Sequence, residues 1–407
     1  MQNIAPQDIA ATAVRSEDRP GGGGSTQPHA AGLYIHIPFC LRKCVYCDFY
    51  SVTERSRLPD FLEALEKEIQ WQNLRAPAYD TLYFGGGTPS LLEADPLDRI
   101  IQSIGKHFNL QAHAEITLEV NPGTVSRGKL MAYRRMGINR LNIGVQSFDN
   151  GNLRFLGRVH DAHQSRQVLD QARQAGFENL GLDLIYGLPN QTAATWRRDL
   201  AGALAWKPEH LSCYMLTLEA GTPLAEAARR GKWRPLSDGQ TARLFKVTVG
   251  YLADHGYRLY EVSNFARLDS DSAGDFRSRH NRKYWSQVAY TGLGPSAHGF
   301  RPPCRLWNQR SLADYLNAIA GGKLPVAGVE TLSARQEFVE ALFLGLRTRE
   351  GIHLQALKER FGFEFQTRFA HPLKILTEEG LIVLEADRCR LTLDGMLVMD
   401  SVIGMFL

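Results

Sequence analysis

Short runs of apolar and β-branched residues alternate with longer amphipathic stretches over the first half of the chain. The runs have the length and composition of buried β-strands, whereas the stretches repeat apolar residues every three or four positions, as one helix face does. The expected strands are residues 33–37, 80–84, 115–120, 140–145, 180–186 and 211–216. The expected helices include residues 59–74, 126–137, 163–175 and 192–205. A repeat of roughly 30 to 45 residues is what βα units require.

This pattern predicts an α/β fold of six βα units, either an open partial (β/α)6 barrel or a doubly wound sheet. Chemically distinctive residues follow five of the strands. They are the cysteines after residue 37 and the stretches "GGGTP" (85–89), "EVNPG" (119–123), "GVQSF" (144–148) and "DLIYGLP" (183–189). Sites in barrels gather at the C-terminal ends of the strands. The five endings therefore favour the partial barrel.

Beyond about residue 300 the pattern changes to helices followed by a hairpin. Helical periodicity covers residues 333–348, 353–361 and 366–379, and "LIVLEADRCRLTL" (381–393) has the pattern of a hairpin. This order predicts a C-terminal helical domain that resembles a winged helix. Residues 333–407 carry 9 Lys and Arg against 11 Asp and Glu. A structural or docking role is therefore favoured over nucleic-acid binding.

Composition narrows the class of protein. The 407 residues suit one large domain with an accessory domain. A net charge of +4, from 47 basic and 43 acidic residues, favours neither nucleic acid nor a membrane surface as a partner. No apolar run approaches the ~20 residues of a transmembrane segment. Six cysteines are too few for a disulfide scaffold, so a reducing cytoplasm is the expected location.

Four segments are expected along the chain. They are a disordered tail (1–31), the barrel (32–245), a connecting region that contains "HNRKYW" (246–310) and the C-terminal accessory domain (311–407). The tail is predicted from "GGGGSTQPHAAG", which is polar and rich in glycine. The polar segment 267–279 is expected to be a mobile loop.

Three cysteines, Cys40, Cys44 and Cys47, lie within eight positions after the first strand. They cannot sensibly pair with one another, because one would remain free in so small a loop. A zinc site would need a fourth ligand, and only His36 is nearby. An iron–sulfur cluster is the other candidate. Three thiolates on a four-iron cluster would leave one iron open for another ligand.

The spacing C-x3-C-x2-C after the first barrel strand resembles that of the radical S-adenosylmethionine (SAM) superfamily. The resemblance implies a [4Fe–4S] cluster whose open iron chelates the amino and carboxylate groups of SAM. Gly86, Gly87 and Thr88 are similar to the motif that holds the SAM amino group. Other positions that resemble contacts to SAM or to a second ligand are Tyr34, Tyr46, Glu119, Gln146, Arg158 and Asp183.

From about residue 32 onward the motifs together resemble one branch of this superfamily, the oxygen-independent coproporphyrinogen III oxidases and the related haem chaperones. The oxidases have a further cysteine two positions after the third, where this chain has Phe49. "HNRKYW" (280–285) resembles a motif of the chaperones in which the histidine is linked to haem. The resemblance implies His280 as an axial haem ligand, with Tyr284 and Trp285 against the porphyrin. His298 is a second candidate ligand.

Three functions stay open. The first is a haem chaperone that uses the cluster and SAM and delivers haem to acceptor proteins such as respiratory cytochromes, membrane-bound enzymes included. The second is an oxidase that converts coproporphyrinogen III to protoporphyrinogen IX. The third is a radical SAM enzyme that opens or alkylates the haem ring. Phe49 and "HNRKYW" favour the first. Whether the chain forms a homodimer is left open.

Overall fold

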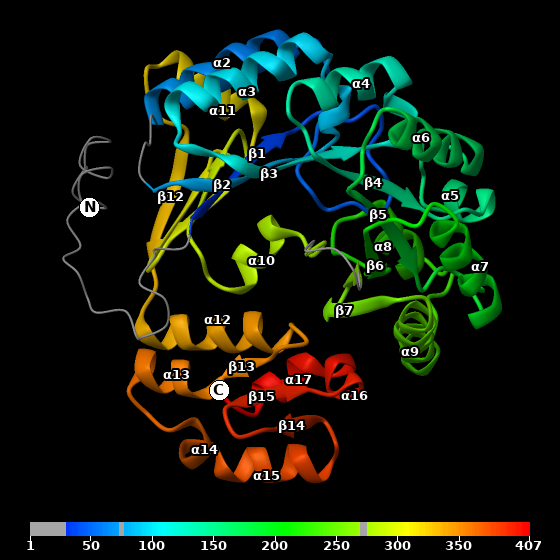
Figure 1. The fold of residues 1–407 in the computed structure, drawn as a ribbon, viewed down its shortest axis with the longest axis vertical. Helices are drawn as coiled ribbons and strands as arrows, with labels where there is room; N and C mark the ends of the chain where they lie inside the picture. The colour runs from blue at the N-terminus through cyan, green and yellow to red at the C-terminus, as the bar shows by residue number, and fades with distance from the viewer. Residues whose placement is uncertain (1–29, 73–76, 269–274) are drawn as a thin grey trace.

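The computed structural model describes residues 30–72, 77–268 and 275–407, in which a parallel sheet forms the centre of the molecule (Figure 1). Its strands in the predicted repeats are β1 (Ala31–Ile37), β2 (Tyr79–Gly86), β3 (Leu110–Val120), β4 (Arg140–Gln146), β5 (Leu180–Tyr186) and β6 (His210–Met215). Each of them overlaps a predicted strand, which confirms the predicted α/β fold. Most of the expected tail, residues 1–29, lies outside the described residues. Ala31, also placed in that tail, is buried within β1 instead.

Helices cover the outer face of these strands (Figure 1). They are α2 (Leu58–Gln72), α3 (Ala94–His107), α4 (Arg127–Arg135), α5 (Asn150–Phe155), α6 (Ala162–Gln174) and α7 (Ala193–Leu204). Two short 3-10 helices, η1 (Pro89–Leu91) and η2 (Pro122–Thr124), follow β2 and β3. The four predicted helices are all present. In α2, for example, Phe61, Leu65 and Ile69 lie on one face and are completely buried.

Strand alternation gives the sheet one apolar and one polar face. In β1, Leu33, Ile35 and Ile37 belong to the hydrophobic core, whereas Tyr34 and His36 point to the opposite, inner face. Tyr34 contacts the ring of Tyr83 there, at 6.2 Å between centroids. Polar side chains from successive strands therefore meet inside the partial barrel.

The sheet extends beyond the six predicted strands on both sides. Within the described residues its order is β12-β11-β10-β9-β1-β2-β3-β4-β5-β6-β8-β7. The additional strands are β7 (Tyr257–Glu261), β8 (Asn264–Arg267), β9 (Tyr290–Leu293), β10 (His298–Arg301), β11 (Cys304–Asn308) and β12 (Val326–Thr331). They are short, so sequence periodicity did not predict them. The predicted domain limits lie in the helix Asp238–Asp254 (residue 245) and just after β11 (residue 310). Strands of this one sheet stand on both sides of each limit, so the connecting region continues the sheet of the barrel.

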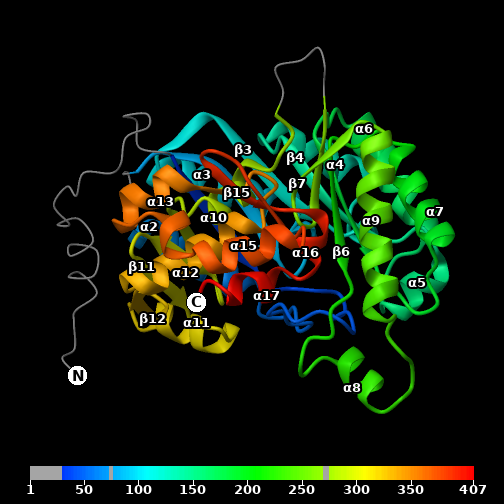
Figure 2. The ribbon, with the colours of Figure 1, turned by 90° about the horizontal axis from the view of Figure 1, so that it is seen from below.

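Four helices connect or flank these strands, namely α8 (Pro223–Arg229), α9 (Asp238–Asp254), α10 (Arg279–Trp285) and α11 (Leu312–Ala320). Helix α10 carries "HNRKYW" and lies at the inner side of the sheet, between the barrel and the C-terminal helices (Figure 1). Residues 269–274 of the predicted mobile loop lie outside the described residues. Figure 2 shows α8 projecting from the barrel.

The C-terminal part forms a separate small sheet with helices, as the winged-helix prediction requires. Its elements are α12 (Ala334–Leu346), β13 (Ile352–His353), α13 (Leu354–Phe361), α14 (Phe365–Arg368), α15 (Ala370–Glu378), β14 (Ile382–Leu384), β15 (Arg388–Leu391), α16 (Leu393–Leu397) and α17 (Met399–Gly404). The helix predicted over 366–379 is divided at Phe369, whose ring stacks on Phe338 at 5.9 Å. Within the described residues, no helix is long and apolar enough to cross a membrane.

Candidate functional site

The segment between β1 and α2, residues 38–57, carries the three clustered cysteines and is called the cysteine loop here. Two backbone hydrogen bonds close its base, from Cys40 N to Val52 O (2.9 Å) and from Val52 N to Pro38 O (2.7 Å). The three thiols are partly exposed, and in the described part of the chain none of them is in a disulfide. One closed loop therefore presents all three thiols at the C-terminal end of β1.

The thiols do not form a site for a single metal ion. Among the described residues, no group of three His, Cys, Asp or Glu side chains is arranged to hold one ion. In a four-iron cluster each thiolate binds a different iron, so the sulfur atoms need not converge. Burial raises the pKa of the Cys47 thiol, and coordination to iron would offset this effect because a metal-bound thiol is deprotonated. The donor set fits a cluster with one open iron.

Two residues predicted from the SAM motifs contact the cysteine sulfurs. The Thr88 hydroxyl donates to Cys40 Sγ at 3.5 Å. Arg158 Nη1 donates to Cys44 Sγ at 3.4 Å, while its Nη2 donates to Gly144 O at 2.9 Å. The ends of β2 and β4 are thereby connected to the cysteine loop.

The glycines after β2 allow the chain to pass close to the end of β1. Gly86 has a φ of +108°, and a Cβ there would lie 2.7 Å from the His36 ring. A Cβ on Gly87 would lie 2.8 Å from Phe39 O and 2.9 Å from the carbonyl carbon of Pro38. Both glycines were predicted to permit a close ligand. In the structure they permit close packing against the base of the cysteine loop.

Two partly buried carboxyl groups, Glu119 on β3 and Asp183 on β5, face the inside of the barrel. Glu119 Oε1 accepts a hydrogen bond from Tyr83 OH at 2.8 Å. Burial, with a contribution from nearby Asp183, raises the pKa of Glu119 to about 7. Burial also raises the pKa of Asp183 to about 6, although Asn142 Nδ2 donates to its Oδ2 at 2.8 Å. Both groups can therefore change protonation near neutral pH when a charged ligand binds.

Three buried polar atoms at this end of the barrel have no hydrogen-bond partner in the described part of the chain. They are Gln146 Oε1, Arg158 Nε and Asp183 Oδ1. Gln146 also has a left-handed φ of 65°. Unsatisfied buried polar atoms are costly in a folded protein, at about 1 to 3 kcal/mol each. Two of these atoms are hydrogen-bond acceptors and the third, Arg158 Nε, is a cationic donor. Together they fit a polar ligand such as SAM, which carries an ammonium, a carboxylate and hydroxyls.

The two tyrosines predicted to contact SAM occupy different surroundings. Tyr34 OH lies 3.2 Å from His36 Nδ1 inside the barrel. Tyr46 packs against a small apolar cluster of Leu156, Ile185 and Leu188. Tyr34 therefore borders the polar interior, and Tyr46 lies on the cysteine loop, where its ring packs on the apolar cluster and its hydroxyl group interacts with Arg158 near Cys44 and Cys47.

His280, predicted as a haem ligand, is deeply buried and only 1% exposed. Its Nδ1 lies 2.8 Å from Thr81 Oγ1, and its Nε2 lies 2.8 Å from Tyr284 OH. Burial, with nearby Lys283, lowers the pKa of His280 to about 3, so the ring is neutral. Both ring nitrogens are already hydrogen-bonded. Binding of a metal at either nitrogen would require one of these bonds to open.

The other candidate side chains lie apart from this pair. His36 is buried and its Nε2 lies 3.0 Å from Tyr50 O of the cysteine loop. His298 stacks on Trp307 at 6.2 Å in an adjoining strand. Trp285, expected against the porphyrin, contacts Tyr260 at 5.6 Å between ring centroids. These contacts give His36 a clear structural role in holding the cysteine loop.

Sequence reasoning missed several residues of the inner face. Thr81 and Tyr83 precede "GGGTP" by an even number of positions, so they share a strand face with Gly85. Glu115 accepts hydrogen bonds from Arg279 N (3.2 Å) and His280 N (3.0 Å), which fixes the start of α10. The period of two along β2 and β3 could have identified these residues. Their contact with α10 could not be predicted, because α10 lies about 165 residues further along the chain.

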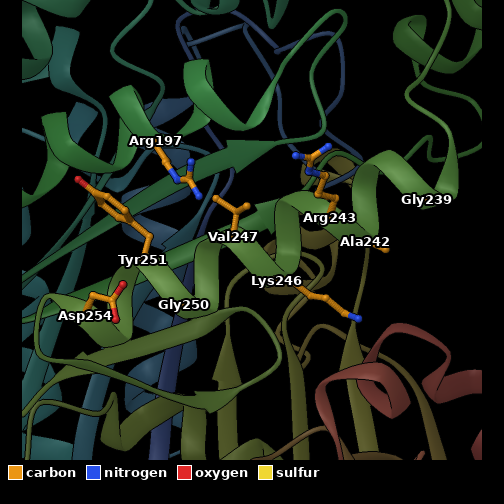
Figure 3. Close-up of a pocket in the computed structure, with 9 residues that line it drawn as sticks. All are labelled: Arg197, Gly239, Ala242, Arg243, Lys246, Val247, Gly250, Tyr251 and Asp254. Carbon is orange, nitrogen blue, oxygen red and sulfur yellow. The ribbon is translucent and has the colours of Figure 1, made fainter.

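A separate hollow lies on the outer surface between α7 and α9, with a volume of about 700 Å³ (Figure 3). Figure 3 shows Arg197, Arg243 and Lys246 along it, with Tyr251 and Asp254 at one end. None of the nine residues that line it belongs to the predicted site. The candidate cofactor site is therefore the inner end of the barrel.

Comparison with known families defines the class of protein. Residues 34–201 match the Radical SAM superfamily, and residues 332–398 match the HemN C-terminal domain. The chain is thus a radical SAM protein with a HemN-type C-terminal domain. Membership of this superfamily implies a [4Fe–4S] cluster and SAM, and the thiols and open polar atoms described above fit both.

Similar proteins narrow the class further. The chain is 33% identical to the heme chaperone HemW of Lactococcus lactis over 382 residues, which cover 94% of this chain and 98% of the relative. It is also 33% identical to the heme chaperone HemW of Bacillus subtilis, over 92% of this chain and 98% of the relative. The chain belongs to the HemW family, as the sequence predicted.

A solved structure supports the fold. Coproporphyrinogen III oxidase (HemN) from Escherichia coli, described as a radical SAM enzyme, superimposes with a TM-score of 0.82 at 25% identity. The superposition covers 99% of this chain and 93% of the oxidase. The predicted fold class is therefore confirmed, and this chain and the oxidase share one architecture.

Proposed function

We propose that the protein is a haem chaperone that binds haem and transfers it to acceptor haemoproteins such as respiratory cytochromes. The observation that carries the proposal is Phe49, which is 71% exposed on the cysteine loop, two residues after Cys47. The oxidases of this branch are expected to have a cysteine there, and a phenyl ring cannot replace thiol chemistry. An exposed aromatic ring beside the cofactor site instead offers apolar surface to a porphyrin. The HemW relatives described above support the same function.

We further propose that Cys40, Cys44 and Cys47 hold a [4Fe–4S] cluster and that the adjoining barrel residues hold SAM. When bound, the cluster supplies the electron that cleaves the SAM sulfonium. The chain itself binds and orients these groups. Thr88 and Arg158 position two of the cysteine sulfurs.

The polar groups of SAM would be held by the open atoms of the barrel. Asp183 Oδ1 and Gln146 Oε1 can accept hydrogen bonds from the ammonium or from hydroxyls, and Arg158 Nε can donate to the carboxylate. Glu119, whose pKa is about 7, can lose its proton and form an ion pair with the ammonium. Gly86 and Gly87 keep this end of β2 against the cysteine loop. Tyr34 and Tyr46 border the same region.

Haem would bind at α10, where His280 and Tyr284 form a hydrogen-bonded pair on the inner side of the sheet. A coproporphyrinogen III oxidase is the second candidate function, because the oxidase from Escherichia coli has the same architecture. The residues proposed to hold SAM are common to both functions and do not distinguish them. Phe49 does, and it favours the chaperone over the oxidase.

Haem titration of the anaerobically reconstituted protein tests the proposal. We expect wild type to bind haem and His280→Ala to bind it at least about tenfold more weakly, a difference of about 1.4 kcal/mol. His298→Ala is the matched control, because this histidine lies in β10 rather than in α10 and stacks on Trp307. Equal affinity and identical spectra for wild type and His280→Ala would remove His280 from the haem site. A wild-type protein without affinity for haem would contradict the function itself.

A further inference from the structure

Side chains from two distant parts of the chain form one hydrogen-bonded row: Thr81 of β2, and His280 and Tyr284 of α10. Tyr284 OH lies 2.8 Å from His280 Nε2, and Thr81 Oγ1 lies 2.8 Å from His280 Nδ1. A neutral imidazole has one donor and one acceptor nitrogen, whereas a hydroxyl can take either role. The row can therefore exist in two states, one with the phenol as donor to Nε2 and one with Nε2–H as donor to the phenol oxygen.

Solvent and ligands have less access to His280 than to Tyr284. The His280 ring is enclosed by Tyr83, stacked at 5.0 Å, and by Tyr34, stacked at 6.4 Å. The Tyr284 ring meets it edge-on at 5.1 Å and occupies the direction of Nε2. His280 is 1% exposed, whereas Tyr284 is half-buried. Because the phenol lies directly against Nε2, a metal that approaches this nitrogen meets the Tyr284 oxygen first.

The row is also fixed in place. Glu115 accepts both Arg279 N and His280 N at the start of α10. Lys283 forms an ion pair with Asp80 at 2.6 Å and donates to Ala30 O at 2.5 Å, so the middle of the helix is held as well. Because α10 is anchored at these points, Tyr284 cannot move away from His280 Nε2 without breaking contacts of this helix. The existing geometry is better suited to binding at the oxygen itself.

We propose that Tyr284 is the axial ligand of ferric haem, as a phenolate, and that His280 is the positioning residue that donates a hydrogen bond to it from Nε2. This inference rests on the proposed haem-binding function. Tyrosinate is an established axial ligand of haem iron. The Fe–O bond forms and the phenol O–H bond breaks, with no change in the oxidation state of the iron. Nε2 carries a proton in the product, Thr81 donates to Nδ1, and one proton in all is released to solvent.

The loss of the phenol proton determines how this step responds to pH. A tyrosine phenol has an ordinary pKa of about 10, so it carries its proton at neutral pH until the Fe–O bond forms. Haem binding therefore releases a proton, and affinity increases as pH increases.

Other titratable groups around Tyr284 limit the range in which this effect can be measured. The titratable groups that interact with Tyr284 are Tyr34 on β1, Glu119 on β3, Tyr290 on β9 and His280 on α10. Other groups act on α10 around it: Asp80 pairs with Lys283, Glu115 accepts from His280 N, and Tyr83 stacks on His280. Arg282 and Lys283 lie next to Tyr284 in the sequence. Of these, Glu119 has a pKa of about 7, and its carboxylate would oppose formation of a phenolate. Proton release is therefore best measured at about pH 6, where Glu119 is mostly protonated.

The test compares Tyr284→Phe, His280→Ala and the control Tyr290→Phe as full-length, cluster-reconstituted proteins titrated with ferric haem. We expect a resonance Raman Fe–O phenolate vibration in wild type and in Tyr290→Phe, with one proton released per haem. Tyr284→Phe should lose that vibration, release no proton and bind at least about tenfold more weakly. His280→Ala should keep the vibration at a shifted frequency, with reduced affinity.

The opposite model makes the opposite prediction for Tyr284→Phe. If His280 itself were the ligand, removal of the phenol would free Nε2, and Tyr284→Phe would bind haem at least as tightly as wild type with a histidine-ligated spectrum. That result would overturn the inference while leaving the proposed function intact. A wild-type protein that binds no haem would overturn both. Iron and sulfide contents equal to those of wild type confirm that each variant is folded.

Discussion

Replacing Cys40, Cys44 or Cys47 singly with serine is expected to reduce cluster iron and sulfide in the anaerobically reconstituted protein by at least about tenfold. The cysteine loop is closed by backbone hydrogen bonds that none of these substitutions removes, so the loss should follow from the thiolate alone. The two sulfurs that accept hydrogen bonds from Thr88 and Arg158 would be replaced by oxygens, which are weaker ligands for this kind of cluster. Iron and acid-labile sulfide per chain, together with the spectrum of the reduced cluster, provide the measurement.

Cys304→Ser is the matched control for this experiment. Cys304 is also partly exposed, but it lies in β11 and its sulfur is 3.6 Å from Thr331 Oγ1. The control should retain the full cluster. Full iron and sulfide in all three single variants of the clustered cysteines would contradict the assignment of these residues as ligands.

Gly87→Ala is expected to disrupt the cofactor site, because it adds a methyl group where the chain leaves β2 and passes the base of the cysteine loop. The new Cβ would lie 2.8 Å from Phe39 O, 2.9 Å from the carbonyl carbon of Pro38 and 3.0 Å from Ile37 O. All three atoms are backbone and cannot rotate away, so β2 or the base of the cysteine loop must move. Overpacking of this kind costs about 1 to 3 kcal/mol. We expect lower cluster occupancy and SAM binding weakened by at least about tenfold.

Gly105→Ala provides the comparison. Gly105 lies in α3. Apart from its chain neighbours and the backbone of its own helix, no described atom lies within 4 Å of a Cβ placed there. Alanine is favoured over glycine in a helix by up to about 1 kcal/mol, so this variant should be as stable as wild type or more stable. Thermal unfolding, iron content and SAM titration distinguish the two variants. If Gly87→Ala matched Gly105→Ala in all three, close packing of β2 on the cysteine loop would not matter for the site.

The sequence was sufficient to predict the six strands of the barrel repeats and the residues at their ends. Strand periodicity, the position of Cys40 after an apolar run and the positions of Glu119 and Asp183 within such runs are local properties. The placement of these residues inside the barrel follows from them. The short strands β7 to β12 were missed because runs of four to six residues carry little periodicity. Their place in the main sheet depends on pairing with β1 and β6, which no local pattern shows.

The surroundings of His280 show the main limit of sequence reasoning. The motif predicts His280 as a haem ligand, a role that needs a free imidazole nitrogen. The partners of its two nitrogens are Thr81, 199 residues earlier, and Tyr284, four residues later. Spacing along α10 could have indicated the second partner, since residues four apart share a helix face. The first depends on how α10 packs against β2, which only the folded structure shows.

The predicted role of Gly86 and Gly87 differs from the contacts that these glycines make in the structure. "GGGTP" was expected to let a ligand approach the backbone closely. The structure shows that Gly86 and Gly87 instead meet His36 and the chain that enters the cysteine loop. Absence of a side chain is needed in both interpretations. What the sequence could not supply was the identity of the neighbour.

Transfer of haem is the most direct test of the proposed function. The reconstituted protein, loaded with haem, is mixed with an apo-form of a bacterial respiratory cytochrome, with excess albumin present to trap haem that dissociates into solution. The increase in the spectrum of the haem-bound cytochrome is followed with time, and free haem in the same mixture serves as the reference. A haem chaperone should load the cytochrome in the presence of albumin, whereas free haem should not. Loading no faster than from free haem, together with conversion of coproporphyrinogen III to protoporphyrinogen IX by the same preparation, would contradict it.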